Sequence, residues 1–174
     1  MTGVLASLAL VVASVAAAAF PTPTEQPVDE QHCVIFVVGK AADGELIMTQ
    51  PDCFADAEVA EMWAQIGMAY PSTSTAGGGV VTLSTFTLGR HYDGYNGTGS
   101  SIRIVGSSCT GGYWNTTSTW DNRISSSYNG CARLRHYAYP NKVSPFDDTQ
   151  GSGTTDNLNS TLNNNAESIS YHSS

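Results

Sequence analysis

The stretch Arg90-His-Tyr92-Asp-Gly-Tyr-Asn-Gly-Thr-Gly99-Ser-Ser101 decides the fold, because its opening returns later in the chain as Arg135-His-Tyr137. A second string, Trp120-Asp-Asn-Arg-Ile-Ser-Ser126, is echoed in the same order by Leu162-Asn-Asn-Asn-Ala-Glu-Ser168. The sequence therefore contains two copies of a unit of about 43 residues, each with an aromatic strand and turn followed by a polar loop. A unit of that size is too small to fold singly, so we expect the two copies to share one core.

Short β-prone runs, separated by turns rich in Gly, Asn and Ser, surround these strings. The runs that predict strands cover residues 80–83, 86–88, 101–105, 132–137 and 168–171. No helical periodicity of useful length occurs after residue 70. Regularly spaced short strands without helices are typical of an all-β sandwich.

The strings of the first copy are similar to motifs of the βγ-crystallin superfamily. Its Greek-key motif is an aromatic residue, six residues, Gly, any residue and Ser, and Tyr92, Gly99 and Ser101 stand at those places. Its calcium-binding motif, (Asn/Asp)-(Asn/Asp)-x-x-(Ser/Thr)-Ser, is matched by residues 121–126. The resemblance extends over residues 86–171 and points to secreted microbial single-domain members, including the group that contains the actinobacterial metalloproteinase inhibitor. It implies two Greek-key motifs that pack as a βγ-crystallin-type sandwich over residues 80–174.

The second copy departs from these motifs. Ser144 and Phe146 stand where the Greek-key motif has Gly and Ser, so we expect its hairpin to differ from the first. Residues 145–155 look like an insertion that replaces a regular strand with a loop. In the calcium motif, Glu167 takes the place of Ser or Thr.

Residues 121–126 suit calcium because Asp, Asn and Ser offer the oxygen atoms that this hard cation takes, about six to eight at a time. The resemblance implies side-chain ligands from Asn122 and Ser125 in a loop that begins at Asp121. It also implies a backbone carbonyl ligand from Arg123 and another from the hairpin of the other repeat, near Ala138.

The resemblance implies a paired calcium site on the second loop. Its ligands would be the side chains of Asn164 and Glu167, the Asn165 carbonyl and the region of Asp93. The alternative for both loops is a set of Asx-rich turns whose side chains cap local backbone groups.

The chain before residue 71 has a different composition from the rest. Residues 20–70 hold nine acidic residues and one basic residue, whereas residues 71–174 hold six of each. We expect an acidic, Pro-rich segment at 20–32, a small ββα accessory or pro-segment at 33–70, and a Gly/Ser/Thr-rich linker at 71–79. Strands are predicted at 33–38 and 45–49. The helical spacing of four apolar side chains predicts a helix over 56–66; they are Val59, Met62, Trp63 and Ile66.

Residues 1–19 are predicted to be a secretory signal peptide. The run is apolar, rich in Ala and uncharged, and small residues precede Phe20. A membrane anchor is the alternative, but the run is shorter than the roughly 20 residues that span a bilayer. We therefore expect a secreted, extracellular protein.

A secreted protein explains the four cysteines, which form an even set without a C-x-x-C pair. We predict the disulfides Cys33–Cys53 and Cys109–Cys131, because each would close a short loop within one half of the chain. The sequence also contains three glycosylation sequons, at Asn96, Asn115 and Asn159.

The sequence contains no recognisable catalytic motif, so we predict that the protein is not an enzyme. His91 and His136 take equivalent places in the two repeats, and we expect them to pack or to lie on a strand face rather than to act as bases. The adjacent Asp147 and Asp148 are expected in a solvated loop. The net charge of −8 also argues against nucleic acid and anionic membranes as partners.

Two functions remain. The first is a secreted, monomeric, calcium-binding βγ-crystallin-like module with a structural, stress-related or toxin-like role. The second is a secreted peptidase inhibitor, of the metalloproteinase-inhibitor group, acting through loops such as 106–117. There Tyr113 and Trp114 form either a recognition patch or part of the core.

Overall fold

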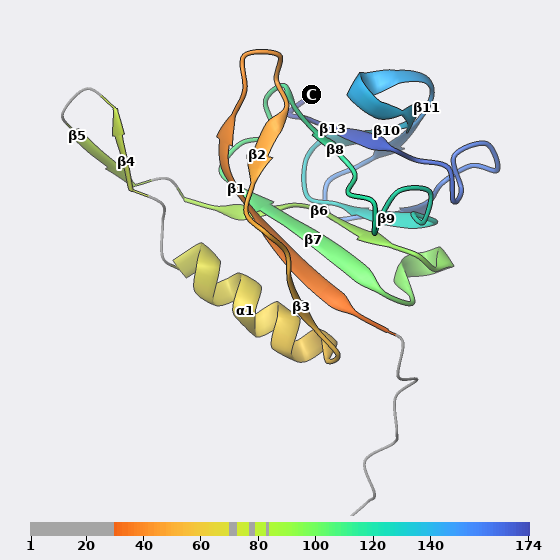
Figure 1. Cartoon of the computed structure of the whole chain (residues 1–174), viewed down its shortest axis with the longest axis horizontal. Helices are drawn as coiled ribbons and strands as arrows, with labels where there is room; N and C mark the ends of the chain where they lie inside the picture. The colour runs from red at the N-terminus through yellow and green to blue at the C-terminus, as the bar shows by residue number, and fades with distance from the viewer. Residues whose placement is uncertain (1–29, 70–72, 77–78, 83) are drawn as a thin grey trace, which may run out of the picture.

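The computed structural model describes residues 30–69, 73–76, 79–82 and 84–174 (Figure 1). The predicted signal peptide and nearly all of the acidic segment lie outside these residues. The first part of the chain forms β1 (His32–Lys40), β2 (Leu46–Met48), β3 (Asp52–Phe54), α1 (Ala57–Ala69), β4 (Thr73–Ala76) and β5 (Gly79–Thr82). The second part forms β6 (Phe86–Tyr92), η1 (Tyr95–Gly97), β7 (Ser101–Gly106), β8 (Gly112–Asn115), β9 (Ser126–Asn129), β10 (Arg133–Tyr139), η2 (Pro140–Lys142), β11 (Val143–Gln150), β12 (Thr155–Asn157) and β13 (Ser168–His172).

The prediction of a β-rich fold is confirmed, and each run predicted as a strand overlaps one. Within the linker predicted at 71–79, residues 73–76 form β4, which pairs with β5 as an antiparallel hairpin. The loop predicted at 145–155 was wrong. The insertion at 145–155 instead contributes to β11, which pairs with β10 from Val143 to Gln150. Pro145 is tolerated in this strand because β11 lies at the edge of its sheet.

The strands form two main sheets that are related by the repeat. The larger sheet has the order β12-β9-β6-β7-β1-β2, with β3 also paired to β1, and the smaller has the order β8-β13-β10-β11. The first four strands of the larger sheet correspond, place by place, to the four strands of the smaller. In each set one outer strand, β12 or β8, comes from the other repeat. Neither repeat can therefore complete its sheet alone.

The segment 33–70 is part of the larger sheet. Its strand β1 runs parallel to β7, with His32 opposite Ser101 and Phe36 opposite Val105. Cys33 and Ile35 of β1 are buried in the same core as the later strands; that core includes Ile102, Ile104, Trp114, Trp120, Ile124, Leu134, Leu162, Ile169 and Tyr171. The strand β3 makes the segment βββα where the sequence predicted ββα. The domain boundaries themselves stay a prediction.

Both predicted disulfides are confirmed. The first links Cys33 of β1 to Cys53 of β3, and the second links Cys109 to Cys131. Two disulfides fit an extracellular protein. Among the residues that the structure describes, no helix has the length and apolarity to cross a membrane.

Helix α1 covers the outer face of the larger sheet (Figure 1). It begins after Asp56, whose carboxylate accepts hydrogen bonds from the backbone N–H groups of Glu58 and Val59. The helix buries its small residues Ala60 and Ala64, and a side chain at Gly67 would collide with the ring of Phe36. Small residues on this face therefore let the helix lie close to the sheet.

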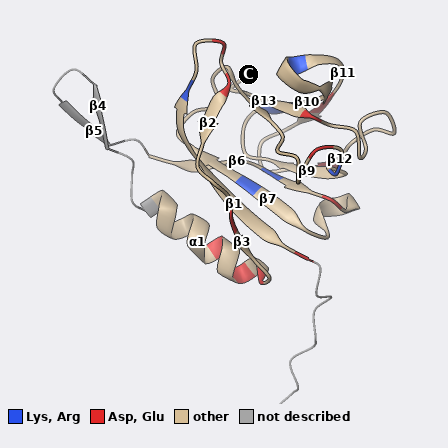
Figure 2. Cartoon of the chain, viewed as in Figure 1, with Lys and Arg blue, Asp and Glu red and all other residues tan. Residues whose placement is uncertain are grey.

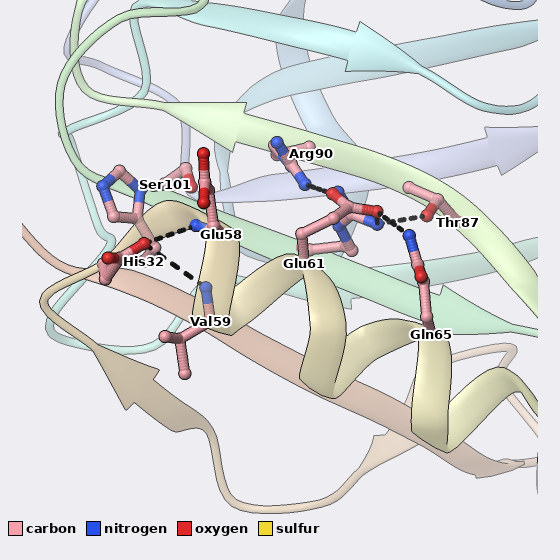
Figure 3. Close-up of polar contacts among 10 residues, drawn as sticks. His32, Glu58, Val59, Glu61, Gln65, Thr87, Arg90 and Ser101 are labelled. Carbon is pink, nitrogen blue, oxygen red and sulfur yellow. Dashed lines mark hydrogen bonds and ion pairs between the residues drawn. The ribbon is translucent and has the colours of Figure 1, made fainter.

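Glu61 fixes this helix to the sheet (Figure 3). Its carboxylate forms ion pairs with Arg90 of β6, at 2.5 Å, and with Arg103 of β7. These two arginines face each other across neighbouring strands, where like charges are destabilising. At the corresponding place in the smaller sheet, Arg135 faces Asp148 and pairs with it at 2.6 Å. The larger sheet has no such pair of its own, so the charge of its two arginines is balanced by the Glu61 carboxylate of α1.

We expect the substitution Glu61→Gln to lower the free energy of unfolding by about 2 kcal/mol, because it leaves the buried Arg103 and the half-buried Arg90 side by side without an anion. Urea unfolding monitored by circular dichroism measures this loss. The matched control is Glu58→Gln on the exposed side of the same helix, with an expected change below about 0.5 kcal/mol. Equal losses for the two variants would show that Glu61 does not anchor the helix.

Candidate functional site

The two polar loops that the sequence singles out lie against each other. Asn122 in one loop and Asn164 in the other adopt the same left-handed backbone conformation, with φ of 58° and 53°. The Asn122 N–H donates to the Ala166 carbonyl, and the Asn164 N–H donates to the Ile124 carbonyl. Each loop is anchored in the core by two buried side chains; they are Trp120, Ile124, Leu162 and Ala166. Trp120 is therefore a core residue, and the loops form one rigid pair.

One group of oxygen atoms gathers around Ser125, and we call it the Ser125 cluster. The Ser125 hydroxyl lies 2.9 Å from the Asp93 carbonyl oxygen and 3.0 Å from Asn164 Oδ1. The carboxylate of Asp93 is paired with the guanidinium of Arg123 at 2.7 Å. The cluster thus combines three neutral oxygen atoms with a fixed cation nearby.

The equivalent group gathers around Glu167, and we call it the Glu167 cluster. Asn122 Nδ2 donates to Glu167 Oε1 at 3.2 Å. Thr116 donates its hydroxyl hydrogen to Asp121 and also lies 3.1 Å from the Glu167 carbonyl oxygen. Two carboxylates, those of Asp121 and Glu167, therefore lie in or beside this cluster.

Backbone hydrogen bonds place Ala138 in the Glu167 cluster. The Glu167 N–H donates to the Tyr137 carbonyl, just as the Ser125 N–H donates to the Tyr92 carbonyl. By this correspondence Ala138 takes the place that Asp93 has in the other repeat. The Ala138 carbonyl therefore corresponds to the Asp93 carbonyl, whose oxygen lies 2.9 Å from the Ser125 hydroxyl.

The structure brings the predicted site residues together in exchanged pairs. The sequence assigned Asn122 and Ser125 to one site and Asn164 and Glu167 to the other. In the structure Ser125 meets Asn164, and Asn122 meets Glu167, because each cluster takes residues from both loops. Arg123 and Asn165 were predicted to offer backbone carbonyls. Their side chains bond the Thr119 and Thr161 carbonyls within their own loops, and Arg123 also pairs with Asp93.

The oxygen atoms of these clusters are the feature that bears on the predicted calcium sites. Over the described parts of the chain, no three His, Cys, Asp or Glu side chains gather in a way that could hold a metal ion. The clusters instead offer hydroxyl, amide and carbonyl oxygen atoms, which calcium accepts together with carboxylates. The Glu167 cluster carries more negative charge, because it has two carboxylates, whereas the one carboxylate beside the Ser125 cluster, that of Asp93, is paired with Arg123.

Reciprocal asparagine pairs brace the turns next to the clusters. The Asn96 N–H donates to Asn157 Oδ1 at 2.6 Å, and Asn157 Nδ2 donates back to Asn96 Oδ1 at 2.8 Å. The other repeat has the same pair between Asn141 and Asn115, at 2.8 and 3.0 Å. The sequence analysis missed Asn141 and Asn157, although the repeat places them at the positions of Asn96 and Asn115.

The three sequons lie in different settings. Asn96 and Asn159 are exposed, whereas the Asn115 amide donates to both Glu45 and Asn141. A glycan on Asn115 would replace one of these amide hydrogens and weaken the brace. Glycosylation at all three positions stays a prediction.

The structure places the remaining candidates in the fold. Tyr113 and Trp114 are buried, which favours the core alternative over a recognition patch. Asp147 and Asp148 lie in β11, so the predicted solvated loop was wrong, and Asp148 is tied to Arg135. This ion pair holds the pKa of Asp148 below its ordinary value.

His91 and His136 form a buried network between the two sheets. The Ser127 hydroxyl lies 2.8 Å from His91 Nδ1 and 2.8 Å from His136 Nε2, and His91 Nε2 lies 3.3 Å from the Tyr171 hydroxyl. Burial holds the pKa of His91 well below its ordinary value, with a further effect of His136, and lowers the pKa of His136 to about 4. Both imidazoles are therefore neutral packing groups at neutral pH.

No protein-family model matches the chain, and no curated protein or solved structure matches it either. A proposal for its function therefore rests on the internal repeat and on the geometry of the two clusters.

The histidine network predicts a loss of stability in mild acid. The unfolded chain takes up protons below a pH of about 6.5, whereas the folded histidines resist protonation, so the stabilisation present above that pH is lost as the pH falls toward 4. Between pH 6 and pH 5 we expect a loss of about 1.2 kcal/mol for each of the two histidines. Urea unfolding across pH 5.0–7.5 measures this slope.

The variants His136→Gln and His172→Gln separate this network from the other histidines. We expect His136→Gln to reduce the slope by about half. His172 is only partly buried, so its replacement should leave most of the slope. A slope unchanged by His136→Gln would refute the assignment.

Proposed function

We propose that the protein is a secreted calcium-binding module of the βγ-crystallin class, with two Greek-key motifs. The exchange of β8 and β12 between the two sheets supports this architecture. The observation that carries the calcium proposal is the meeting of Asn122 with Glu167 across the two loops. A structural, stress-related or toxin-like role follows as an expectation, and so does a monomeric state.

The two calcium sites are unequal in this proposal. The Glu167 cluster would hold the ion through the side chains of Asn122 and Glu167 and the carbonyl of Ala138, with Asp121 adding charge nearby. The Ser125 cluster would use Ser125, Asn164 and the Asp93 carbonyl, but there the Asp93 carboxylate is already paired with Arg123 and adds no net negative charge. We therefore assign the tighter site to the Glu167 cluster.

A peptidase inhibitor is the second proposal, and one feature of the structure favours it. Residues 107, 108, 110 and 111 are exposed on both sides of Cys109, whose disulfide ties this loop to Cys131. Lys40 Nζ donates to the Thr110 carbonyl, and the Tyr113 N–H donates to the Gly44 carbonyl. A peptidase would thus meet an exposed loop that is already held in shape, which lowers the entropy cost of binding.

The calcium proposal predicts a thermal shift. With a dissociation constant near 0.1 mM, about 1 mM calcium stabilises the folded state by about 1.4 kcal/mol, or about 4 °C in melting temperature. We expect Glu167→Gln to remove most of this shift, because it takes a charged ligand from the tighter site. Differential scanning calorimetry of the full chain in calcium and in EDTA measures it.

The matched control is Glu58→Gln, which makes the same chemical change on α1 and should keep the shift. Arg123→Gln should enlarge the shift, since it removes a cation from the Ser125 cluster. If the unmodified protein gains nothing from calcium, the loops are capping turns and the calcium proposal is wrong.

The inhibitor proposal is tested with a small panel of metallopeptidases and a fluorogenic peptide substrate. We expect a stoichiometric loss of peptidase activity that weakens when Ser108 and Thr110 are both replaced by bulky Arg residues in the exposed loop. Asn159→Arg, an exposed substitution in another loop, is the control. Full peptidase activity in excess protein would contradict this second proposal.

A further inference from the structure

The solvent side of α1 carries four large apolar residues. Val59, Met62, Trp63 and Ile66 are 39, 56, 41 and 42% exposed. The sequence analysis predicted the helix from these residues, yet the helix turns Ala60 and Ala64 toward the sheet instead. We call the four exposed residues the apolar face of α1.

This face is continuous rather than scattered. Residues three and four apart on a helix are neighbours, so Val59, Met62, Trp63 and Ile66 form one stripe. Single exposed apolar residues are ordinary, but a contiguous stripe on a helix marks an interaction surface. Trp63 is also held in place, because its indole N–H donates to Asp52 at 3.0 Å and its ring packs beside Phe54.

The surroundings of the face are acidic (Figure 2). Asp52, Asp56 and Glu58 are exposed on its borders. No Lys, Arg or His occurs anywhere between residues 41 and 69. A partner that covers this face must therefore bring apolar side chains and positive charge together.

The same charges argue against three other occupants. A second copy would place its own acidic border against this one. Residues 20–29 of the same chain contain Glu25 and Asp29 but no basic residue. An anionic membrane would be repelled as well.

We propose that the apolar face of α1 is a docking site for a basic, amphipathic segment of another protein. The four apolar side chains supply the buried contact, and Asp52, Asp56 and Glu58 attract the basic residues at its border. The site lies on the outer side of the larger sheet and needs no calcium, so it is independent of the two loop clusters.

An 18-residue synthetic peptide of Leu and Lys, with Leu at helical spacing, is the probe for this site. Binding to the full chain in EDTA can be followed by tryptophan fluorescence. Trp63 is 41% exposed, whereas Trp114 and Trp120 are each 3% exposed, so a blue shift on binding reports on the apolar face. We expect micromolar binding that weakens as salt is added, and at least tenfold weaker binding of the equivalent Leu and Glu peptide.

Exposed residues allow variants that test the apolar contact and the charge separately. We expect Met62→Ser with Ile66→Ser to weaken binding of the Leu and Lys peptide at least tenfold, measured by calorimetry, with an unchanged circular dichroism spectrum. Tyr139→Ser with Val143→Ser removes two equally exposed residues from the other part of the fold and should leave binding intact. Glu58→Gln should weaken it severalfold.

Four results would overturn the proposal. The first is equal binding of the peptide to the Met62→Ser, Ile66→Ser variant, which would mean that charge alone attracts it. The second is no binding to the unmodified chain. The third is a concentration-dependent dimer that the same double variant dissociates, and the fourth is tight binding to phosphatidylglycerol vesicles; either would give the face another occupant.

Discussion

The exchange of one strand between the two repeats is the constraint on which the rest of the structure depends. Because β8 completes the sheet of the second repeat and β12 that of the first, both repeats must fold together. The same exchange brings the loops after β8 and after β12 face to face, so each oxygen cluster draws on both. It also encloses His91 and His136 between the sheets, where neutral imidazoles can share the Ser127 hydroxyl.

One charge difference between the repeats explains why α1 lies on one sheet only. Arg103 of β7 and Asp148 of β11 occupy corresponding positions beside Arg90 and Arg135. The smaller sheet is neutral at this point through its own ion pair, whereas the larger sheet presents two cations and accepts Glu61. A chain with two nearly equivalent halves thus acquires one helix, and with it a surface that the smaller sheet lacks.

The sequence predicted local features well and their combinations poorly. Strands rich in branched and aromatic residues were visible, but β9 and β12 are built from Ser, Tyr, Asn, Thr and Asp and gave no apolar pattern. Both disulfides followed from loop length. The helix was found through Val59, Met62, Trp63 and Ile66, yet periodicity cannot reveal that Ala60 faces the sheet. Likewise, the motif located Asn122 and Ser125. Their contacts with Glu167 and Asn164 depend on the strand exchange, which cannot be predicted from the spacing of residues within one loop.

The sheet edges bear on how the folded protein behaves at high concentration. Open strand edges invite other chains to pair with them and begin aggregates. Here β12 and β2 are three residues long, β8 is four, and β11 carries Pro145 with Asp147 and Asp148. The longer edge of β7 is covered by β1. The strand β1 therefore protects β7 from pairing with other chains, and a chain without β1 would expose an edge strand of six residues that carries no Pro and no acidic residue.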